Sequence, residues 1–274
     1  MPVDRAYRLG AVVYHPKVEE IWELFGVWFA EQGFPLDVSF HARYDEQVDA
    51  LLAGELDTAW NTNLAHVLTL QQAPGAGAIA MRDTDRGWRS HLVVRADSDL
   101  ASLEDLVDAR VGFGDADSPQ AHILPVHALR AEGFDPAERM EATRLDRDLG
   151  KHGDTGGAEL AQLARVRSGE LEASVVSSVV SSVTLDAITR LGDAEELRVV
   201  WTSPPFHHCC FTVLPGGDEG RHARFAELLR GMDVADPKLC EPMALEYVNA
   251  WVDFDASGYD DLVAAVAAGP VVVG

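Results

Sequence analysis

The chain has 274 residues, 47% of them hydrophobic and 24% charged, and its 45 acidic against 22 basic residues give a formal net charge of −23. Such a composition belongs to a folded globular protein rather than a disordered chain, and the length suits two lobes better than a single core. The acidic excess disfavours nucleic acid and anionic membrane surfaces as partners, because their phosphates would be repelled.

Three features bear on where the protein works. Apolar runs such as 263–268 are too short to cross a bilayer, so we expect no membrane insertion. The first five residues, MPVDR, lack the charged-then-apolar layout of a secretory signal. The odd number of cysteines, Cys209, Cys210 and Cys240, is not a disulfide framework and fits a reducing compartment. We therefore expect a cytoplasmic protein.

Strand and helix patterns alternate along the first third of the chain. Apolar residues at Ile21, Leu24, Phe25 and Phe29 recur at helical spacing, and Gly33 ends that pattern. The predicted strands cover 7–14, 36–41, 58–61, 76–81 and 90–95, and the predicted helices cover 18–32, 45–53 and 63–72. Alternation of this kind predicts a mostly parallel sheet with helices on both of its faces.

A second set of elements begins near Asp97. The predicted strands cover 110–114, 140–145, 171–176, 197–202 and 211–214, and the predicted helices cover 118–131, 157–168, 221–232, 237–251 and 259–268. We expect the strand at 197–202 to carry the chain back to the first set. The fold class is therefore α/β with two lobes and two hinge crossovers, lobe one being 1–95 with 199–274 and lobe two 96–198.

Polar loops follow the predicted strands, which is where ligands bind in α/β sheets. The candidates for ligand contact in the first loops are His15, Asn61, Asn63, Arg82 and Trp88. Trp88 could cover a ligand with its indole ring or serve as an aromatic of the hinge core. Asp83 and Asp85 are read as partners of the neighbouring arginines rather than as a carboxylate pair for acid/base work.

Ser118 followed by Pro119 predicts a helix start in the second lobe. Serine is a preferred N-cap and proline a preferred first helical residue. Exposed N–H groups and the helix dipole would make this start an anion site, although an ordinary capped helix has the same sequence. The loop 150–157, with Lys151, His152 and Asp154, could wrap an anion or hold a metal, or be a surface turn.

The segment His-His-Cys-Cys at 207–210 raises the possibility of a transition metal. Imidazole and thiolate bind zinc, iron or copper, but adjacent strand residues point to opposite faces, so only alternate members can share an ion. A composite site could draw on His15 and on the metal candidates His122, His152, Asp154, His208 and Cys209. The alternative is a pair of buried cysteines beside two structural histidines.

Three stretches resemble the phosphonate/phosphate-binding components of ABC importers, a type 2 periplasmic-binding-protein family. They are LLAGELDTAWNTN at 51–63, the block GWRSHLVV…AEGFDP at 87–136, and VVWTSPPF at 199–206, within a resemblance that extends from about Leu9 to Leu214. The resemblance implies the two-lobed type 2 fold and a small anion held by both lobes.

The same resemblance implies which residues hold the anion. They are Ser118, Gln120 and Ala121 at the helix start, Trp88 in place of a hinge tyrosine, and Tyr44 from lobe one. The chain departs from the family where Ser-Thr-Ser-Gly is replaced by the Ser-Pro-Gln-Ala of 118–121. It departs again where Gly-His-Glu is replaced by 151–154, with Glu159 nearby.

Two hypotheses follow for the function. The first is a cytoplasmic protein that binds a small anionic or polar molecule, similar to phosphonate, phosphate or carboxylate, in a cleft between the lobes. The second is a metal-dependent enzyme of small-molecule biosynthesis on the same scaffold, with Lys151 or Glu159 as the acid/base group. Because no secretory signal is present, an ABC permease is not expected as a partner.

Overall fold

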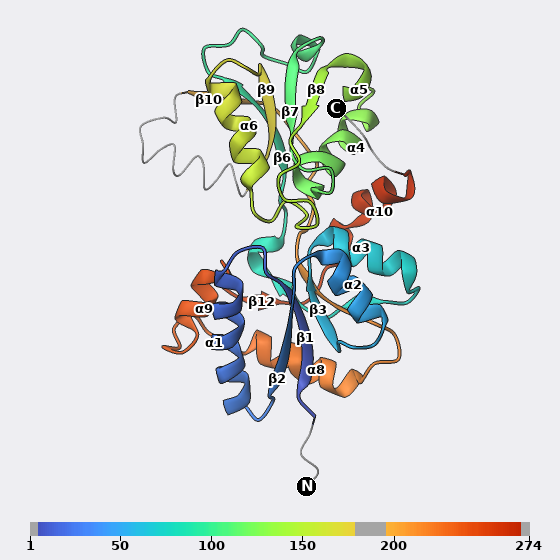
Figure 1. Ribbon diagram of the computed structural model, residues 1–274, viewed down its shortest axis with the longest axis vertical. Helices are drawn as coiled ribbons and strands as arrows, with labels where there is room; N and C mark the ends of the chain where they lie inside the picture. The colour runs from blue at the N-terminus through green and yellow to red at the C-terminus, as the bar shows by residue number, and fades with distance from the viewer. Residues whose placement is uncertain (1–4, 179–195, 270–274) are drawn as a thin grey trace. The chain divides into compact units, whose positions relative to one another are not determined.

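The computed structural model describes residues 5–178 and 196–269 (Figure 1). Within those residues the chain forms two compact units. The first unit holds the chain up to Arg86 together with His207–Ser257, and the second holds Gly87–Phe206 together with the chain from Gly258 onward. None of the described helices has the length and apolar character needed to cross a membrane.

The unit boundaries differ from the predicted lobe boundaries at 95/96 and 198/199. Strands β6 (Ser90–Arg95) and β10 (Leu197–Thr202) pair with each other, and β6 also pairs with β9 (Ala173–Ser177). Both strands therefore belong to the second unit. The chain also passes between the units a third time near Gly258, because α10 (Asp260–Ala267) packs on α4 (Leu124–Ala131) of the second unit.

The first unit is built on a five-stranded sheet with the order β2-β1-β3-β11-β4. Its strands are β1 (Tyr7–Val12), β2 (Leu36–His41), β3 (Thr58–Asn61), β4 (Gly77–Ala78) and β11 (Cys210–Val213). Strand β1 is parallel to β2 and β3, whereas β11 is antiparallel to β3 and β4. A small second sheet pairs β5 (Met81–Arg82) with β12 (Trp251–Val252).

Helices cover both faces of this sheet. They are α1 (Lys17–Glu31), α2 (Tyr44–Leu52), α3 (Asn63–Gln72), α8 (Glu219–Arg230) and α9 (Cys240–Leu245). Alternate residues of β1 divide between the faces: Leu9 and Ala11 join the core beneath α1 and α8, while Val12 packs with Tyr44 and Val48 of α2. Figure 1 shows α1 on one side of β1 and β2 and α2 with α3 on the other.

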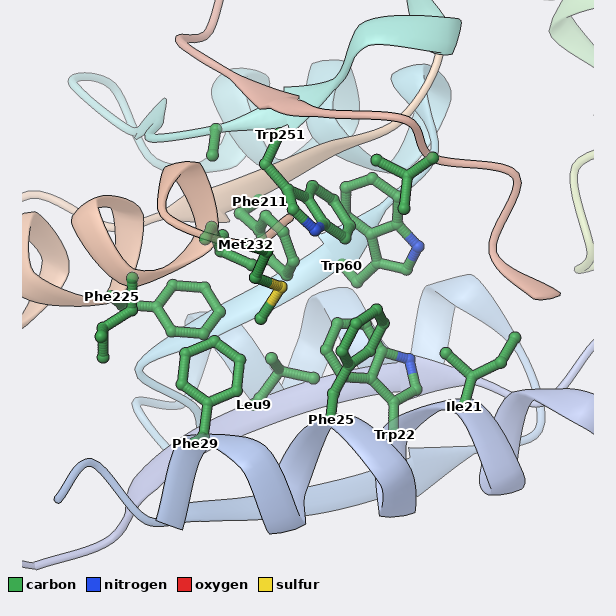
Figure 2. Close-up of a cluster of buried hydrophobic side chains, with 14 of the residues drawn as sticks. Leu9, Ile21, Trp22, Phe25, Phe29, Trp60, Phe211, Phe225, Met232 and Trp251 are labelled. Carbon is green, nitrogen blue, oxygen red and sulfur yellow. The ribbon is translucent and has the colours of Figure 1, made fainter. Parts of the chain in front are cut away.

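The core of the first unit confirms the helical spacing predicted for α1. Ile21, Phe25 and Phe29 are buried as predicted, with Trp22 beside them, whereas Leu24 is only half-buried. Figure 2 shows the buried side chains of α1 pointing toward the sheet, with Phe29 beside Phe225. The ring of Phe29 stacks on that of Phe225 with centroids 5.2 Å apart. Burying side chains of this size contributes about 1.5–3 kcal/mol each, so this aromatic layer is a large share of the unit's stability.

The second unit has a mixed sheet with the order β10-β6-β9-β7-β8. Strand β7 (Arg110–Phe113) is parallel to β8 (Glu141–Arg144) and β9, whereas β6 is antiparallel to its two neighbours. The helical segments among its described residues are the 3-10 turn η2 (Glu104–Leu106), the π turn η3 (Pro119–Ile123), α4, α5 (Pro136–Arg139), α6 (Gly157–Arg167) and α10. Both main sheets thus combine parallel and antiparallel pairs, where a mostly parallel arrangement was predicted.

Candidate functional site

The helix start at Ser118 lies at the carboxyl end of β7 in the second unit. Ser118 is the N-cap that the sequence predicts, since its Oγ accepts the Ala121 amide at 3.1 Å and Pro119 opens the helix. The Ser118 carbonyl accepts both the His122 and Ile123 amides, which gives the first turn its π form. Turn η3 continues directly into α4, so the start belongs to a helix of several turns.

The loop that follows β8 lies directly on this helix start. Asp115 accepts the Arg147 and Asp148 amides at 2.5 and 2.8 Å, and these bonds fix the loop across the helix end. Gly153 has a φ of +79°, and a Cβ there would lie 2.4 Å from both Ser118 Oγ and a side-chain nitrogen of Gln120. Backbone therefore approaches these two side chains as closely as only glycine permits.

As a result, the predicted contact residues of the helix start are covered. Ser118, Gln120 and Ala121 are each at most 2% exposed. Of the loop residues proposed as ligands or acid/base groups, His152 is buried, with a φ of +52°, and Lys151 and Asp154 are half-buried. The sequence located this helix start but did not predict that the loop around His152 would close over it.

Glu159 faces the same space from α6. Its Oε2 accepts the Ser177 amide at 2.6 Å, at the end of β9. Its Oε1 has no well-aligned partner, although the Gln120 amide lies near enough to favour the charged form. Burial dominates and raises the pKa of Glu159 to about 7. We call Asp115, Ser118, Gln120, Gly153 and Glu159 the Ser118 site. The space among Asp115, Ser118, Gly153 and Glu159 is too small to hold a water molecule, so a ligand there requires the loop around Gly153 to move.

A buried ion network occupies the first unit around Arg82. Arg82 donates to both carboxylate oxygens of Asp85 at 2.6 and 2.7 Å, and to the carbonyl and carboxylate of Glu246 at 2.7 and 3.2 Å. Trp60 adds a hydrogen bond of 3.0 Å to Glu246. The interpretation of the acidic pair as arginine partners is confirmed for Asp85, whereas Asp83 accepts hydrogen bonds from the Asn249 and Ala250 amides. Arg82, predicted to contact a ligand, is instead engaged in these internal pairs.

The other predicted contact residues have mainly structural surroundings. Asn61 is buried and accepts the Gln47 amide at 2.7 Å, and Asn63 donates to the His207 carbonyl at 2.9 Å. Tyr44 is buried in the core beside Val12. His15 is exposed, where its Nδ1 accepts the Lys17 amide, and Trp88 is half-buried and bridged to Phe206.

The metal candidates divide between the two units: His15, His208 and Cys209 belong to the first, and His122, His152 and Asp154 belong to the second. Among the described residues, the one group of three whose ligand atoms lie together is Asp85, His208 and Cys209, all within 4.8 Å of one another. His122 is buried in the second unit, with Nδ1 2.9 Å from the Ala116 carbonyl. The sequence singled out His208 and Cys209 but missed Asp85, which lies more than a hundred residues earlier.

A scan against protein families finds the model described as "ABC transporter, phosphonate, periplasmic substrate-binding protein" over residues 13–259. The match spans nearly the whole chain. The chain belongs to this family. The resemblance predicted from the three sequence stretches is thereby confirmed. The expectation that an ABC permease is not a partner finds no support, since the family serves ABC transporters.

A curated relative is distantly similar to this member of the phosphonate-binding family. The probable ABC transporter phosphite binding protein PhnD1 of Prochlorococcus marinus (strain MIT 9301) is 25% identical over 169 residues, which are 60% of this chain and 53% of that protein. The chain thus matches about half the length of this curated relative.

Solved structures agree in fold. PhnD1 from Prochlorococcus marinus in complex with methylphosphonate has a TM-score of 0.72 and 18% identity, covering 96% of this chain and 97% of that one. XAC2383 from Xanthomonas citri bound to ATP has a TM-score of 0.73, with the same identity and coverage. The predicted α/β fold of the type 2 periplasmic-binding proteins is therefore confirmed.

Proposed function

We propose that this protein captures a small phosphorus oxyanion, of the phosphonate or phosphite type, on behalf of an ABC transporter. The observation that carries the proposal is the helix start at Ser118, in a chain that matches the phosphonate-binding family over 13–259. The positive end of a helix and its amides favour an anion, and in α/β sheets ligands bind beyond the carboxyl ends of strands. The relative crystallised with methylphosphonate supports the ligand class.

The Ser118 site favours an oxyanion of low charge. Pro119 has no N–H, and Ser118 Oγ already takes the Ala121 amide, so the helix start has fewer amides to offer than its length suggests. Asp115 and Glu159 place two carboxyl groups beside it. A protonated Glu159 can donate a hydrogen bond to the ligand, whereas a second negative charge on the ligand would meet Asp115. We therefore propose a monoanion as the preferred ligand.

Calorimetry and thermal unfolding with methylphosphonate, phosphite, phosphate and methanesulfonate test the proposal. We expect at least one phosphorus oxyanion to raise the Tm, since a ligand at 100 times its Kd stabilises the folded state by about 2.7 kcal/mol. Chloride at the same ionic strength is the control. If none of the phosphorus compounds binds or raises the Tm, the proposed function is wrong.

A variant pair tests the place of binding. Ser118→Ala removes the hydroxyl at the helix start, and we expect it to weaken oxyanion binding by about tenfold or more, the scale of one charge-assisted hydrogen bond. Ser102→Ala is the matched control, because Ser102 is an exposed serine of the same unit bonded to Asp105. Affinity is compared rather than stability, since losing the N-cap alone also lowers stability. Equal affinities of both variants and the wild type would place the ligand elsewhere.

A further inference from the structure

The group Asp85, His208 and Cys209 contains three different kinds of metal ligand in one buried place. His208 and Cys209 precede strand β11 (Cys210–Val213), so the strand alternation that would send adjacent side chains to opposite faces does not apply to them. The sulfur of Cys209 lies 2.9 Å from His208 Nδ1, and the same nitrogen lies 3.7 Å from Asp85 Oδ1. Ligand atoms on one tetrahedral zinc ion are roughly 3.3–3.6 Å apart, given zinc–ligand bonds of about 2.0–2.3 Å. The two distances lie on either side of this range, so small side-chain shifts would bring all three atoms onto one ion.

We propose that Asp85, His208 and Cys209 bind a single divalent transition-metal ion, zinc being the expected one, inside the first unit. Thiolate, imidazole and carboxylate together are a ligand set that zinc accepts. The three residues are between 0 and 4% exposed, so the ion would be enclosed when the chain folds rather than exchanged at a surface.

The surrounding charges allow such an ion to be buried. Arg82 contacts the carboxylates of both Asp85 and Glu246, so Glu246 can balance the positive charge of Arg82 when Asp85 binds the metal. The two negative charges of Asp85 and a Cys209 thiolate then cancel a divalent cation. Arg82 also donates one hydrogen bond to each oxygen of the Asp85 carboxylate, and hydrogen bonds of this kind orient a carboxylate that binds a metal. Oδ1 therefore accepts only one hydrogen bond from Arg82.

The bound ion would have a structural role, because of where Asp85 and His208 lie in the chain. Asp85 lies just before the chain leaves the first unit at Arg86, and His208 lies just after it returns at His207. The His208 amide already donates to the Asp85 carbonyl at 3.0 Å. A metal on these side chains would join the outgoing and returning segments a second time, and so stabilise the end of the first unit.

The test is elemental analysis of full-length protein produced without a histidine tag in zinc-supplemented medium. We expect about one zinc per chain in the wild type, and under roughly a tenth of that in Cys209→Ser. The double variant Cys210→Ser/Cys240→Ser is the matched control. Cys240 is exposed, and Cys210 is the adjacent residue, whose sulfur lies 3.9 Å from Thr212 Oγ1. This control should keep its metal. Wild-type protein without zinc, or Cys209→Ser with full occupancy, overturns the proposal.

Cobalt substitution keeps the test decisive even where Cys209→Ser does not fold. In the double variant, Cys209 is the one remaining thiol of the chain. Protein of this variant produced with Co²⁺ should show the near-ultraviolet thiolate-to-cobalt charge-transfer band, and bound metal should raise its Tm relative to chelator-treated protein. Absence of the band in folded double variant rejects Cys209 as a ligand.

Discussion

The amide of Ser177 donates a hydrogen bond of 2.6 Å to a Glu159 carboxylate that is otherwise enclosed by protein. Burial outweighs the hydrogen bonds from Ser177 and Gln120, and it therefore raises the pKa of Glu159 to about 7 from an ordinary value of 4.5. An ionisable group of this kind at the end of β9 links the state of the Ser118 site to pH.

The first prediction concerns the pH dependence of stability. The folded state holds the Glu159 proton more tightly than the unfolded chain, so the stabilisation from this group is complete below pH 4.5 and is lost as pH rises toward 7. The stabilisation that is lost is on the order of 3 kcal/mol.

Urea unfolding at pH 5 and pH 8 tests this prediction: Glu159→Gln should lose less stability over this interval than the wild type. Glu138→Gln, at an exposed carboxyl, should behave as the wild type. Parallel curves for all three proteins would contradict this account.

A second prediction concerns the contact between the loop and the helix start. Gly153→Ala places a Cβ 2.4 Å from Ser118 Oγ at a φ of +79°. Gly133→Ala is matched to it, because Gly133 has a φ of +82° and nothing within 4 Å of a Cβ. We expect Gly133→Ala to cost about 1–2 kcal/mol from backbone strain alone. Gly153→Ala should cost a further 1–3 kcal/mol from overpacking and should also change oxyanion affinity. Denaturation of both variants measures the difference; equal costs would mean that the loop is not held against Ser118.

A third prediction concerns the buried ion network. Arg82→Met leaves Asp85 and Glu246, which are 0 and 3% exposed, without their cation. Breaking a buried pair in this way costs about 3–5 kcal/mol. Arg95→Met removes an exposed arginine paired with Asp97 and should leave the stability almost unchanged, because solvent screens an exposed pair. Chemical denaturation of metal-free protein separates the two variants, and a loss near 1 kcal/mol for Arg82→Met would show that the network is solvated.

The local features of this protein were determined by its sequence. The spacing of Ile21, Phe25 and Phe29 predicted α1, because one face of a helix repeats every 3.6 residues whatever it packs against. Ser118 before Pro119 predicted a helix start, because capping needs only the next few residues. Three sequence stretches were also enough to place the chain in its family.

Tertiary structure decided what lies around these features. Strands β6 and β10 are separated by about a hundred residues, and only their pairing moves the unit boundaries to Arg86 and Phe206. No local pattern could bring Asp85 to Cys209 or press Gly153 onto Ser118, since contacts of such sequence separation depend on how whole elements pack. Burial is the physical reason for the rest: the same carboxyl that would be ordinary on a surface becomes, at Glu159, a group that holds its proton near neutral pH.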